Sequence, residues 1–163
     1  PARASWTPSR MRLEAMSKRA ETIILRLRLA QPEEHEELEE LQRRASLELE
    51  EYREQLEAHP DAIHLPPAQI ANGQVIVAEL KGEIAGFAAV VGGELDGLFV
   101  EPDLWGAGIG RALVNAAAHE ARQRGLSLTV IANPRARGFY ENCGFTVEGE
   151  EQTRFGPGLR MSR

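Results

Sequence analysis

The stretch Trp105-Gly106-Ala107-Gly108-Ile109-Gly110-Arg111 decides the fold, because it joins a predicted strand to a predicted helix. Its three glycines stand at every second position and leave the backbone N–H groups free to point outward together. The N-terminus of the following helix carries about half a positive charge from its aligned peptide dipoles. Both features favour a phosphate or pyrophosphate site, although glycines alone also fit a purely structural turn.

The glycine spacing excludes two common nucleotide sites. A P-loop needs the pattern G-x-x-x-x-G-K-[ST], which this stretch lacks. The dinucleotide fingerprint G-x-G-x-x-G belongs to a βαβ unit, whereas hairpins are predicted before this stretch. We therefore do not expect an NAD site.

Three predicted strands precede the glycines. Gln74–Leu80 leads through Lys81-Gly82 to Glu83–Val91, and Gly92-Gly93 leads on to Glu94–Val100. Glycine pairs at these distances are typical of hairpin turns, so the pattern predicts an antiparallel meander.

Helix and strand alternate after the glycines. Apolar residues recur every three or four positions from Ile109 to Gly125, which predicts a helix. Leu126–Ala132 is then predicted to be a strand, followed by a brief helix between Pro134 and Gly144. A last hairpin is expected, with the strands Thr146–Glu150 and Leu159–Arg163 joined by a turn at residues 155–158.

The residues before the meander are predicted to form one strand and one long helix. Ile23–Leu29 alternates at its end between apolar and basic residues, as a half-buried strand does. From Pro32 a single apolar stripe continues without Gly or Pro as far as Pro60, although a kink near Ala45-Ser46 would make two helices. Residues 59–73 are expected to form a loop.

Residues 1–22 are expected to be an N-terminal extension, ahead of a single domain of residues 23–163. Thr7-Pro8 could cap and begin a short helix that runs through Met16, since proline fits the first helical position. We assign this segment no function.

Two blocks of residues, taken together, resemble a known family. Leu98-Phe99-Val100-Glu101-Pro102, followed by Gly106-x-Gly108-x-Gly110, is similar to motif A of the GCN5-related N-acetyltransferases (GNAT). Further on, Asn133-Pro134-x-Ala136-x-x-Phe139-Tyr140-Glu141-x-x-Gly144-Phe145 is similar to their motif B. The resemblance implies an α/β fold with a mixed, mostly antiparallel sheet of six to seven strands and helices on both faces. It also implies a V-shaped cleft between the strands that end at Val100 and Ala132.

The resemblance further implies acetyl-CoA as co-substrate and no metal. The pantetheine arm would lie in the V along the backbone of Leu98, Phe99 and Val100, much as an added strand would. Asn133 would touch the pantetheine amide from the other wall. The pyrophosphate would lie on the amides of Gly106, Ala107, Gly108, Ile109, Gly110 and Arg111. The family often has Gln or Arg where Trp105 stands, which puts in doubt a side-chain contact to CoA there.

Tyr140 matches the family's tyrosine near the cofactor sulfur. Attack of an amine on the thioester releases a thiolate, and a phenol with a reference pKa near 10 can protonate it. The alternative is a core tyrosine packed beside Phe139. A backbone amide near Val100 would meet the developing oxyanion.

Glu94 is the expected general base, because histone-type members of the family have a glutamate at this position. An alkylammonium has a pKa of about 10.4 and must lose a proton before it attacks. Glu94 and Asp96 alternate with Leu98 and Val100 on one side of their strand, and so face the same cleft if no bulge intervenes. Asp96, His64 and water are the alternatives, and a solvated acid is the plain structural interpretation of Glu94.

Composition narrows the setting. The single cysteine, Cys143, excludes an internal disulfide framework and a clustered zinc site, and it is predicted to be buried rather than nucleophilic. The net charge of −6 argues against a nucleic-acid partner. No apolar run approaches the ~20 residues needed to cross a bilayer, and no secretory signal is evident, so a cytoplasmic protein without a membrane partner is expected.

The acceptor is not specified by the sequence. Between Glu33 and Glu57 there are eleven glutamates and three arginines, a balance of −8, which reads as a solvated helix face or as an attraction for a cationic acceptor. We predict direct transfer of an acetyl group from acetyl-CoA to a small amine or a peptide amine. A non-catalytic acyl-CoA-binding or partner-binding module with the same fold is the alternative, and a homodimer is left open.

Overall fold

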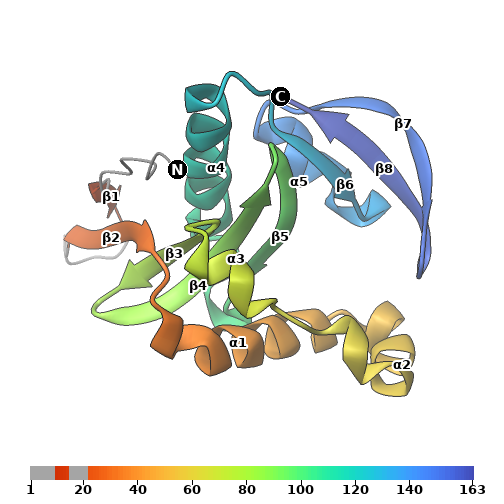
Figure 1. The fold of residues 1–163 in the computed structure, drawn as a ribbon, viewed down its shortest axis with the longest axis horizontal. Coiled ribbons are helices and arrows are strands. Elements are labelled where there is room, and N and C mark those ends of the chain that lie inside the picture. The colour runs from red at the N-terminus through yellow and green to blue at the C-terminus, as the bar shows by residue number, and fades with distance from the viewer. Residues whose placement is uncertain (1–9, 15–21) are drawn as a thin grey trace.

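The computed structural model describes residues 10–14 and 22–163, which form one twisted sheet with helices on both faces (Figure 1). The strand order is β1-β2-β3-β4-β5-β6-β8-β7. The strands are β1 (Arg10–Glu14), β2 (Thr22–Leu29), β3 (Val75–Leu80), β4 (Glu83–Val91), β5 (Glu94–Val100), β6 (Thr129–Ala132), β7 (Thr146–Thr153) and β8 (Gly156–Ser162). The α-helices are α1 (His35–Leu47), α2 (Glu50–Ala58), α3 (Pro67–Ala71), α4 (Ile109–Gln123) and α5 (Arg137–Asn142). Short 3₁₀ turns are η1 (Pro32–Glu34), η2 (Pro60–Ala62), η3 (Pro102–Leu104) and η4 (Pro134–Ala136).

Strand pairing is antiparallel except between β5 and β6, which are parallel. The predicted mixed, mostly antiparallel sheet is therefore confirmed. The meander is confirmed as well, and β4 and β5 begin and end where the glycine turns place them.

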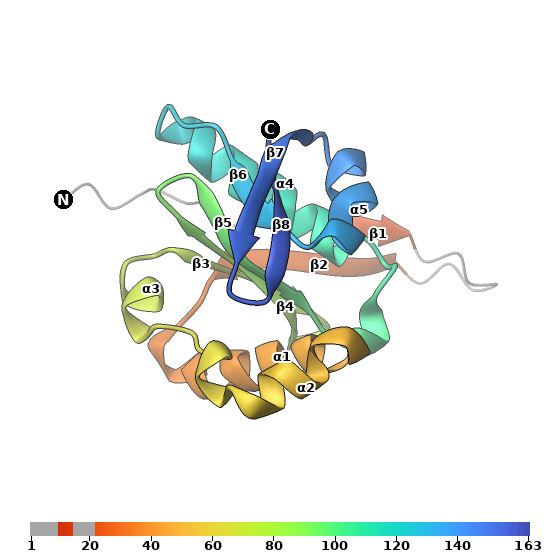
Figure 2. The ribbon, with the colours of Figure 1, turned by 90° about the vertical axis from the view of Figure 1, so that its right-hand side faces the viewer.

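Helices cover the sheet in two layers, each with its own apolar core (Figure 2). On one face α4 packs on β3, β4 and β5 through Leu113, Val114 and Ala117, and Tyr140 of α5 joins the same cluster. On the other face α1 and α3 pack on Val77 and Phe87, with Leu38, Leu41 and Ile70 among the buried residues. Among the described residues no helix has the length and apolar character to span a bilayer.

The long acidic helix is two helices, α1 and α2, as the kink alternative anticipated, but they part at Glu48 and Leu49 rather than at Ala45-Ser46. Leu49 has an extended backbone (φ −82°, ψ 99°) and caps α2. Acidic residues are unfavourable at a helix C-terminus and favourable in a first turn. Glu50 and Glu51 are therefore better placed at the start of a new helix than at the end of a continued one.

The N-terminal expectation of a helix through Met16 is wrong for Arg10–Glu14, which is strand β1, while residues 1–9 and 15–21 lie outside the described part. β1 pairs antiparallel with β2, Arg10 opposite Arg26, and adds an eighth strand to the expected six or seven. The free hydrogen-bonding groups along β2 offer pairing that a short isolated helix lacks, and this outweighs local propensity.

Two further boundaries differ from the expectation. Residues 59–73 are not loop throughout, because they contain η2 and α3, each begun by a proline at a first helical position. The last hairpin turns at Arg154 and Phe155 rather than over residues 155–158, with Thr153 paired to Gly156. Gly158 is instead a packing glycine of β8, because a Cβ there would lie 2.9 Å from Ile131 Cγ2.

Candidate active site

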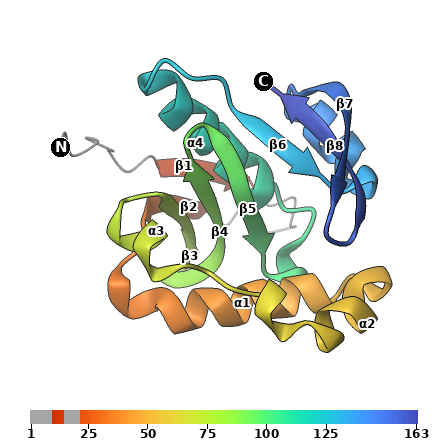
Figure 3. The same cartoon turned by 45° about the vertical axis from the view of Figure 1, so that its right-hand side comes forward.

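The parallel strands β5 and β6 lie close together at one end and diverge toward the other (Figure 3). They pair at Glu94 and Thr129 and then diverge toward Val100 and Ala132. The opening is a cleft of about 880 Å³, which is walled by the two strands, the turn into α4, α1 and α2, α5 and the β7–β8 hairpin. The sequence-based expectation of a splayed cleft at this point is thus met.

The backbone of β5 turns hydrogen-bonding groups toward the cleft. Glu101 N–H donates to Ala85 O of β4 at 2.9 Å. Because neighbouring residues of an antiparallel pair alternate in direction, Phe99 faces β4, whereas Leu98 and Val100 face the cleft. These are the two residues from which backbone contacts to pantetheine were expected.

Trp105 stabilises the end of β5. Its indole Nε1–H donates to Val100 O at 2.8 Å, while 47% of the residue stays exposed on the cleft wall. Trp105, which stands where the family often has Gln or Arg, therefore fixes the end of β5 through this hydrogen bond. It leaves the Val100 N–H and both backbone groups of Leu98 directed into the cleft.

The glycine turn has the backbone that an anion site requires. Gly106 (φ 85°) and Gly108 (φ 87°) are left-handed, a conformation that glycine adopts without strain. Gly108 caps α4, and the first bond of the helix runs from Ala112 N–H to Gly108 O. The N–H groups of Ile109, Gly110 and Arg111 precede that bond and have no partner within the helix.

Gly110 also permits a close approach between two cleft walls. A Cβ at this position would lie 3.3 Å from Phe139 Cζ and 3.8 Å from Val100 Cγ2. Arg111 holds α5 from the same turn, since its Nη2 donates to Asn142 O at 2.8 Å. The turn, the end of β5 and α5 thus meet at one end of the cleft.

Most of the expected cofactor residues line this cleft. Those that do are Leu98, Phe99, Val100, Gly106, Gly108, Ile109, Gly110, Arg111 and Asn133. Ala107 is not among the lining residues. Asn133 caps η4 by accepting a hydrogen bond from Arg135 N–H at 3.0 Å.

Tyr140 is placed differently from these residues. It is 8% exposed, belongs to the core cluster, and its ring centroid lies 5.0 Å from that of Phe139 and 5.3 Å from that of Phe145. Phe139 and Cys143 line the cleft, whereas Tyr140 does not. Burial, and secondarily Cys143, raise the pKa of Tyr140 to about 12, so its phenol is protonated at any physiological pH.

The raised pKa of Tyr140 predicts how the unfolding free energy changes at alkaline pH. Below pH 10 the phenol is protonated in both the folded and the unfolded chain, and its contribution to stability is fully present. Between pH 10 and about 12 the unfolded phenol ionises first, so that contribution is lost. We expect Tyr140→Phe to remove about 2–3 kcal/mol of the fall in unfolding free energy over this interval, since one pKa unit is worth about 1.4 kcal/mol. Denaturant titrations of wild type and variant at about pH 9 and about pH 12 measure it, and equal losses in both proteins would contradict it.

Two carboxylates stand at the other end of the cleft. Glu94 and Asp96 are both exposed and both line it. The expected regular alternation with Leu98 and Val100 is wrong, because a bulge intervenes: the pairing of β4 with β5 shifts between Ala89 and Val90 and leaves Asp96 without a paired residue. Gln69 of α3 donates from Nε2 to Asp96 Oδ2 at 3.1 Å. Gln69 lies in a segment that the sequence analysis left as loop, and no local pattern marked it.

Apolar and aromatic side chains from other elements share the cleft with these carboxylates. Tyr52 and Leu56 of α2 and Phe155 of the β7–β8 turn line the same cleft. Tyr52 and Leu56 belong to the predicted apolar stripe, which gave the only sequence signal for them. The pKa of Tyr52 is raised, first by burial and then by Glu51, while Arg135 and a hydrogen bond with Asn133 act in the opposite direction.

His64 does not join this group. It is exposed and outside the cleft lining, and its Nδ1 lies 3.4 Å from Glu39 Oε2 of α1. Cys143 does line the cleft but is only 6% exposed, and burial raises the pKa of its thiol against the opposing effect of Arg111 and Arg163. A thiol held neutral is a poor nucleophile, as expected for a buried structural cysteine.

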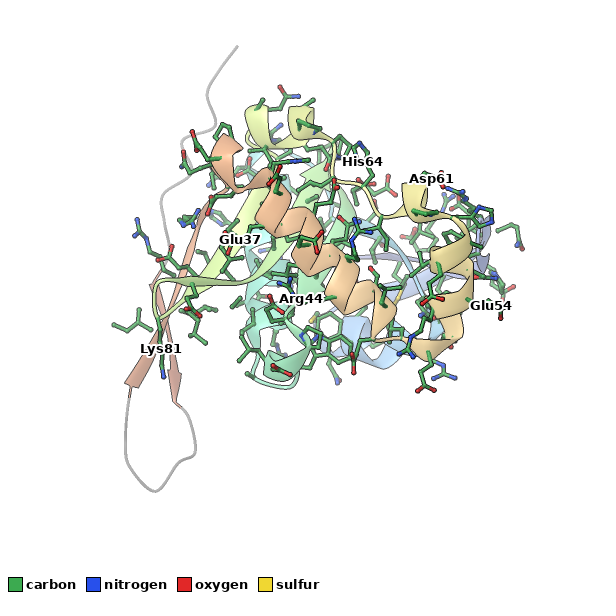
Figure 4. The ribbon with its side chains drawn as sticks, turned by 90° about the horizontal axis from the view of Figure 1, so that it is seen from below. Glu37, Arg44, Glu54, Asp61, His64 and Lys81 are labelled. Carbon is green, nitrogen blue, oxygen red and sulfur yellow. The ribbon has the colours of Figure 1, made fainter. Side chains whose placement is uncertain are left out.

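Ion pairs connect the acidic helices to the opposite rim of the cleft. Arg44 of α1 pairs with Glu101, Glu51 of α2 with Arg135 at 2.8 Å, and Asp61 with Arg154 at 3.1 Å. Viewed from below, Glu37 and Arg44 lie along α1, Glu54 lies on α2 and Asp61 follows it (Figure 4). Of these three pairs only the one with Arg135 neutralises a glutamate of the run from Glu33 to Glu57, while glutamates such as Glu37 and Glu54 are exposed.

Comparison with known proteins agrees with this geometry. Residues 35–145 match the family profile described as the Acetyltransferase (GNAT) family. The chain is 36% identical over 104 residues to the peptidyl-lysine N-acetyltransferase YjaB of Escherichia coli strain K12, covering 63% of this chain. That match spans 65% of YjaB, just under two thirds of its length. The chain is also 31% identical over 131 residues to the 5-NmdU N-acetyltransferase of Pseudomonas phage PaMx11, covering 76% of this chain and 89% of that protein.

Solved structures share the fold. The solution structure of apo YjaB from Escherichia coli has a TM-score of 0.64 and 29% identity, covering 85% of this chain and 96% of that one. A PaiA N-acetyltransferase from Thermoplasma acidophilum, solved in complex with coenzyme A, has a TM-score of 0.66 at 21% identity, with 85% and 98% of the two chains covered.

Proposed function

Because the chain belongs to the Acetyltransferase (GNAT) family, we propose that it transfers an acetyl group from acetyl-CoA to a primary amine by direct attack. One observation carries the proposal. The free backbone groups of β5 and the unpaired amides at the start of α4 open into the same cleft. An extended amide-containing arm that ends in a pyrophosphate matches both sets of groups.

The roles within the cleft follow from this placement of acetyl-CoA. The pantetheine arm binds along Leu98 and Val100 with Asn133 on the opposite wall, and the pyrophosphate binds the amides of residues 106–111. A backbone amide near Val100 stabilises the oxyanion that forms when the amine attacks. Tyr140 protonates the departing thiolate, and the Glu94–Asp96 pair takes the proton of the amine, with Glu94 as the residue expected from sequence.

The acceptor we propose is a primary amine at the end of an apolar stem. Tyr52, Leu56 and Phe155 offer apolar contact along the cleft, and Glu94 and Asp96 offer negative charge at its end. An alkylammonium such as a lysine side chain has this distribution of polarity. YjaB, a peptidyl-lysine N-acetyltransferase by its name, supports this class, whereas the phage relative is named a 5-NmdU N-acetyltransferase.

The proposal is tested by incubating the full chain with acetyl-CoA and each of three amines: a peptide with one internal lysine, n-butylamine, and aspartate. CoA release and the mass of the acetylated product are measured. We expect release to depend on the amine, to favour the peptide and n-butylamine over aspartate, and to weaken when salt shortens the Debye length below ~10 Å, the value at about 0.1 M. Binding of CoA without release for any amine would favour the non-catalytic binding module. Aspartate as the best acceptor would refute attraction by the acidic helices.

A further inference from the structure

We infer that Asp96, rather than Glu94, is the carboxylate that receives the acceptor amine, and that Gln69 is its positioning residue. The inference rests on the proposed function and deepens it. Gln69 lies on α3, outside the glycine turn and the two motifs, and it is not itself a lining residue of the cleft; it contacts the cleft through its hydrogen bond to the lining residue Asp96.

The first argument is position along the V. Glu94 is the residue at which β5 still pairs with β6, opposite Thr129. Asp96 lies two residues further along the strand, at the bulge in the pairing of β5 with β4, where β5 and β6 have parted. It is also the carboxylate nearer in sequence to Leu98 and Val100, whose backbone groups face the cleft. An amine that approaches a thioester held there meets Asp96 first.

The second argument is the charge beside each carboxylate. Glu94 is among the acidic residues that act on Arg160 of β8, whose guanidinium also bonds Glu151. An ammonium at Glu94 would therefore be near the positive charge of the exposed Arg160 side chain. Asp96 is bonded to the neutral amide of Gln69, which orients the carboxylate without cancelling its charge.

The third argument is the way in which Gln69 is held. Its backbone N–H donates to Pro66 O at 3.0 Å, and its O accepts from Gln74 N–H at 2.9 Å. Gln74 O in turn accepts from Val90 N–H of β4 at 2.8 Å, which ties this backbone to the sheet. The donor therefore stands on a fixed support.

The orientation of the Gln69 side chain toward Asp96 is energetically unfavourable for Gln69 itself. A carboxylate only accepts hydrogen bonds, so the amide must present its NH₂ group to Asp96. Its Oε1 is then buried without a partner among the described residues. A buried, unpaired carbonyl oxygen is unfavourable, and a glutamine that served only to fill space could be replaced by an apolar residue without this cost.

Gln69 and Asp96 have separate roles in the proposed transfer of the acetyl group. Gln69 bonds Oδ2, and the acceptor ammonium binds Asp96 at Oδ1 and transfers one proton to it. The amine lone pair then forms the N–C bond to the thioester carbon, the C–S bond breaks, and the thiolate is protonated. The second nitrogen proton replaces, through water, the proton given to the thiolate, Asp96 releases its proton to solvent, and the products are the N-acetylated amine, CoA and one proton.

A double-mutant cycle tests the inference, with acetyl-CoA and a peptide of one internal lysine as substrates and kcat and KM measured for the peptide. The variants are Gln69→Leu, Asp96→Asn and Glu94→Gln, alone and with Gln69→Leu added to each of the other two. We expect Asp96→Asn to lower kcat/KM about 100-fold, in the range of a lost general base. We expect Gln69→Leu to lower it about 10-fold in wild type and in Glu94→Gln, but less than about 2-fold in Asp96→Asn, because coupled residues are not additive.

Gln123→Leu is the matched control. Gln123 ends α4, contacts His119 and lies outside the cleft lining, and its loss should leave activity unchanged. An equal effect of Gln69→Leu with and without Asp96 would show that Gln69 acts structurally and would overturn the inference. So would a larger loss in Glu94→Gln than in Asp96→Asn. A wild-type protein that releases no CoA with any amine would overturn the proposed function as well, whereas an active one with uncoupled Gln69 and Asp96 would overturn this inference alone.

Discussion

Gly110→Glu should lower the affinity for CoA by at least about 100-fold, because two like charges ~4 Å apart near a protein surface repel by ~4 kcal/mol. Gly110 lies in the first turn of α4, where no acidic residue occurs and where the amide N–H groups are unpaired within the helix. A carboxylate at this point would take the place of a phosphate and would add steric conflict with Phe139. Calorimetric titration with CoA measures the effect.

Two further variants separate charge from bulk. Gly110→Ala adds only a Cβ, 3.3 Å from the end of the partly exposed Phe139 ring, and should weaken CoA binding by no more than a few-fold. Gly138→Glu makes the same charge change on α5, where a Cβ meets nothing within 4 Å and the residue lies outside the cleft lining, and should leave affinity unchanged. Unaltered affinity in Gly110→Glu, with an unaltered melting temperature, would place the pyrophosphate elsewhere.

The backbone at the end of the cleft that we propose for the cofactor was predictable because its determinants are local. The left-handed backbone of Gly106 and Gly108 needs glycine, and the glycine turns that bound β4 and β5 set the strand ends. Each of these signals lies within a few residues of the structure it produces. The helix between β5 and β6 was predictable in the same way, because parallel neighbours need a long connection, whereas the V was expected only from the resemblance to the family.

The acceptor end was not predictable in the same way, because its residues meet only in the folded chain. Gln69 and Asp96 are 27 positions apart, and Phe155 comes from a hairpin whose turn was expected elsewhere. The pairing of β1 with the edge of β2 is likewise a tertiary effect without a local signal. Sequence alone also left open whether Tyr140 packs in the core or serves the thiolate.

Tyr140→Phe should lower kcat for acetyl transfer about 100-fold, the usual contribution of a general acid. The phenyl ring would keep its edge contacts with Phe139 and Phe145, so the fold should be preserved and CoA affinity should change by no more than a few-fold. Because burial raises the pKa of Tyr140 to about 12, its phenol stays protonated, and able to donate a proton, at every pH well below that value. No loss of activity from ionisation of this phenol is therefore expected below that pH.

A second tyrosine, Tyr52, lines the cleft, so comparing variants of Tyr52 and Tyr140 can identify which phenol protonates the thiolate. Tyr52 lines the cleft, whereas Tyr140 lies in the core next to two residues that line it. A phenol that protonates CoA must come within hydrogen-bond reach of the sulfur, so Tyr140 can act only if its hydroxyl meets the sulfur at the cleft floor beside Phe139 and Cys143. We expect Tyr52→Phe to affect mainly KM for the amine, because Tyr52 belongs to the acceptor wall. If kcat instead falls in Tyr52→Phe and stays near wild type in Tyr140→Phe, the donor is Tyr52; if it stays in both, water protonates the thiolate.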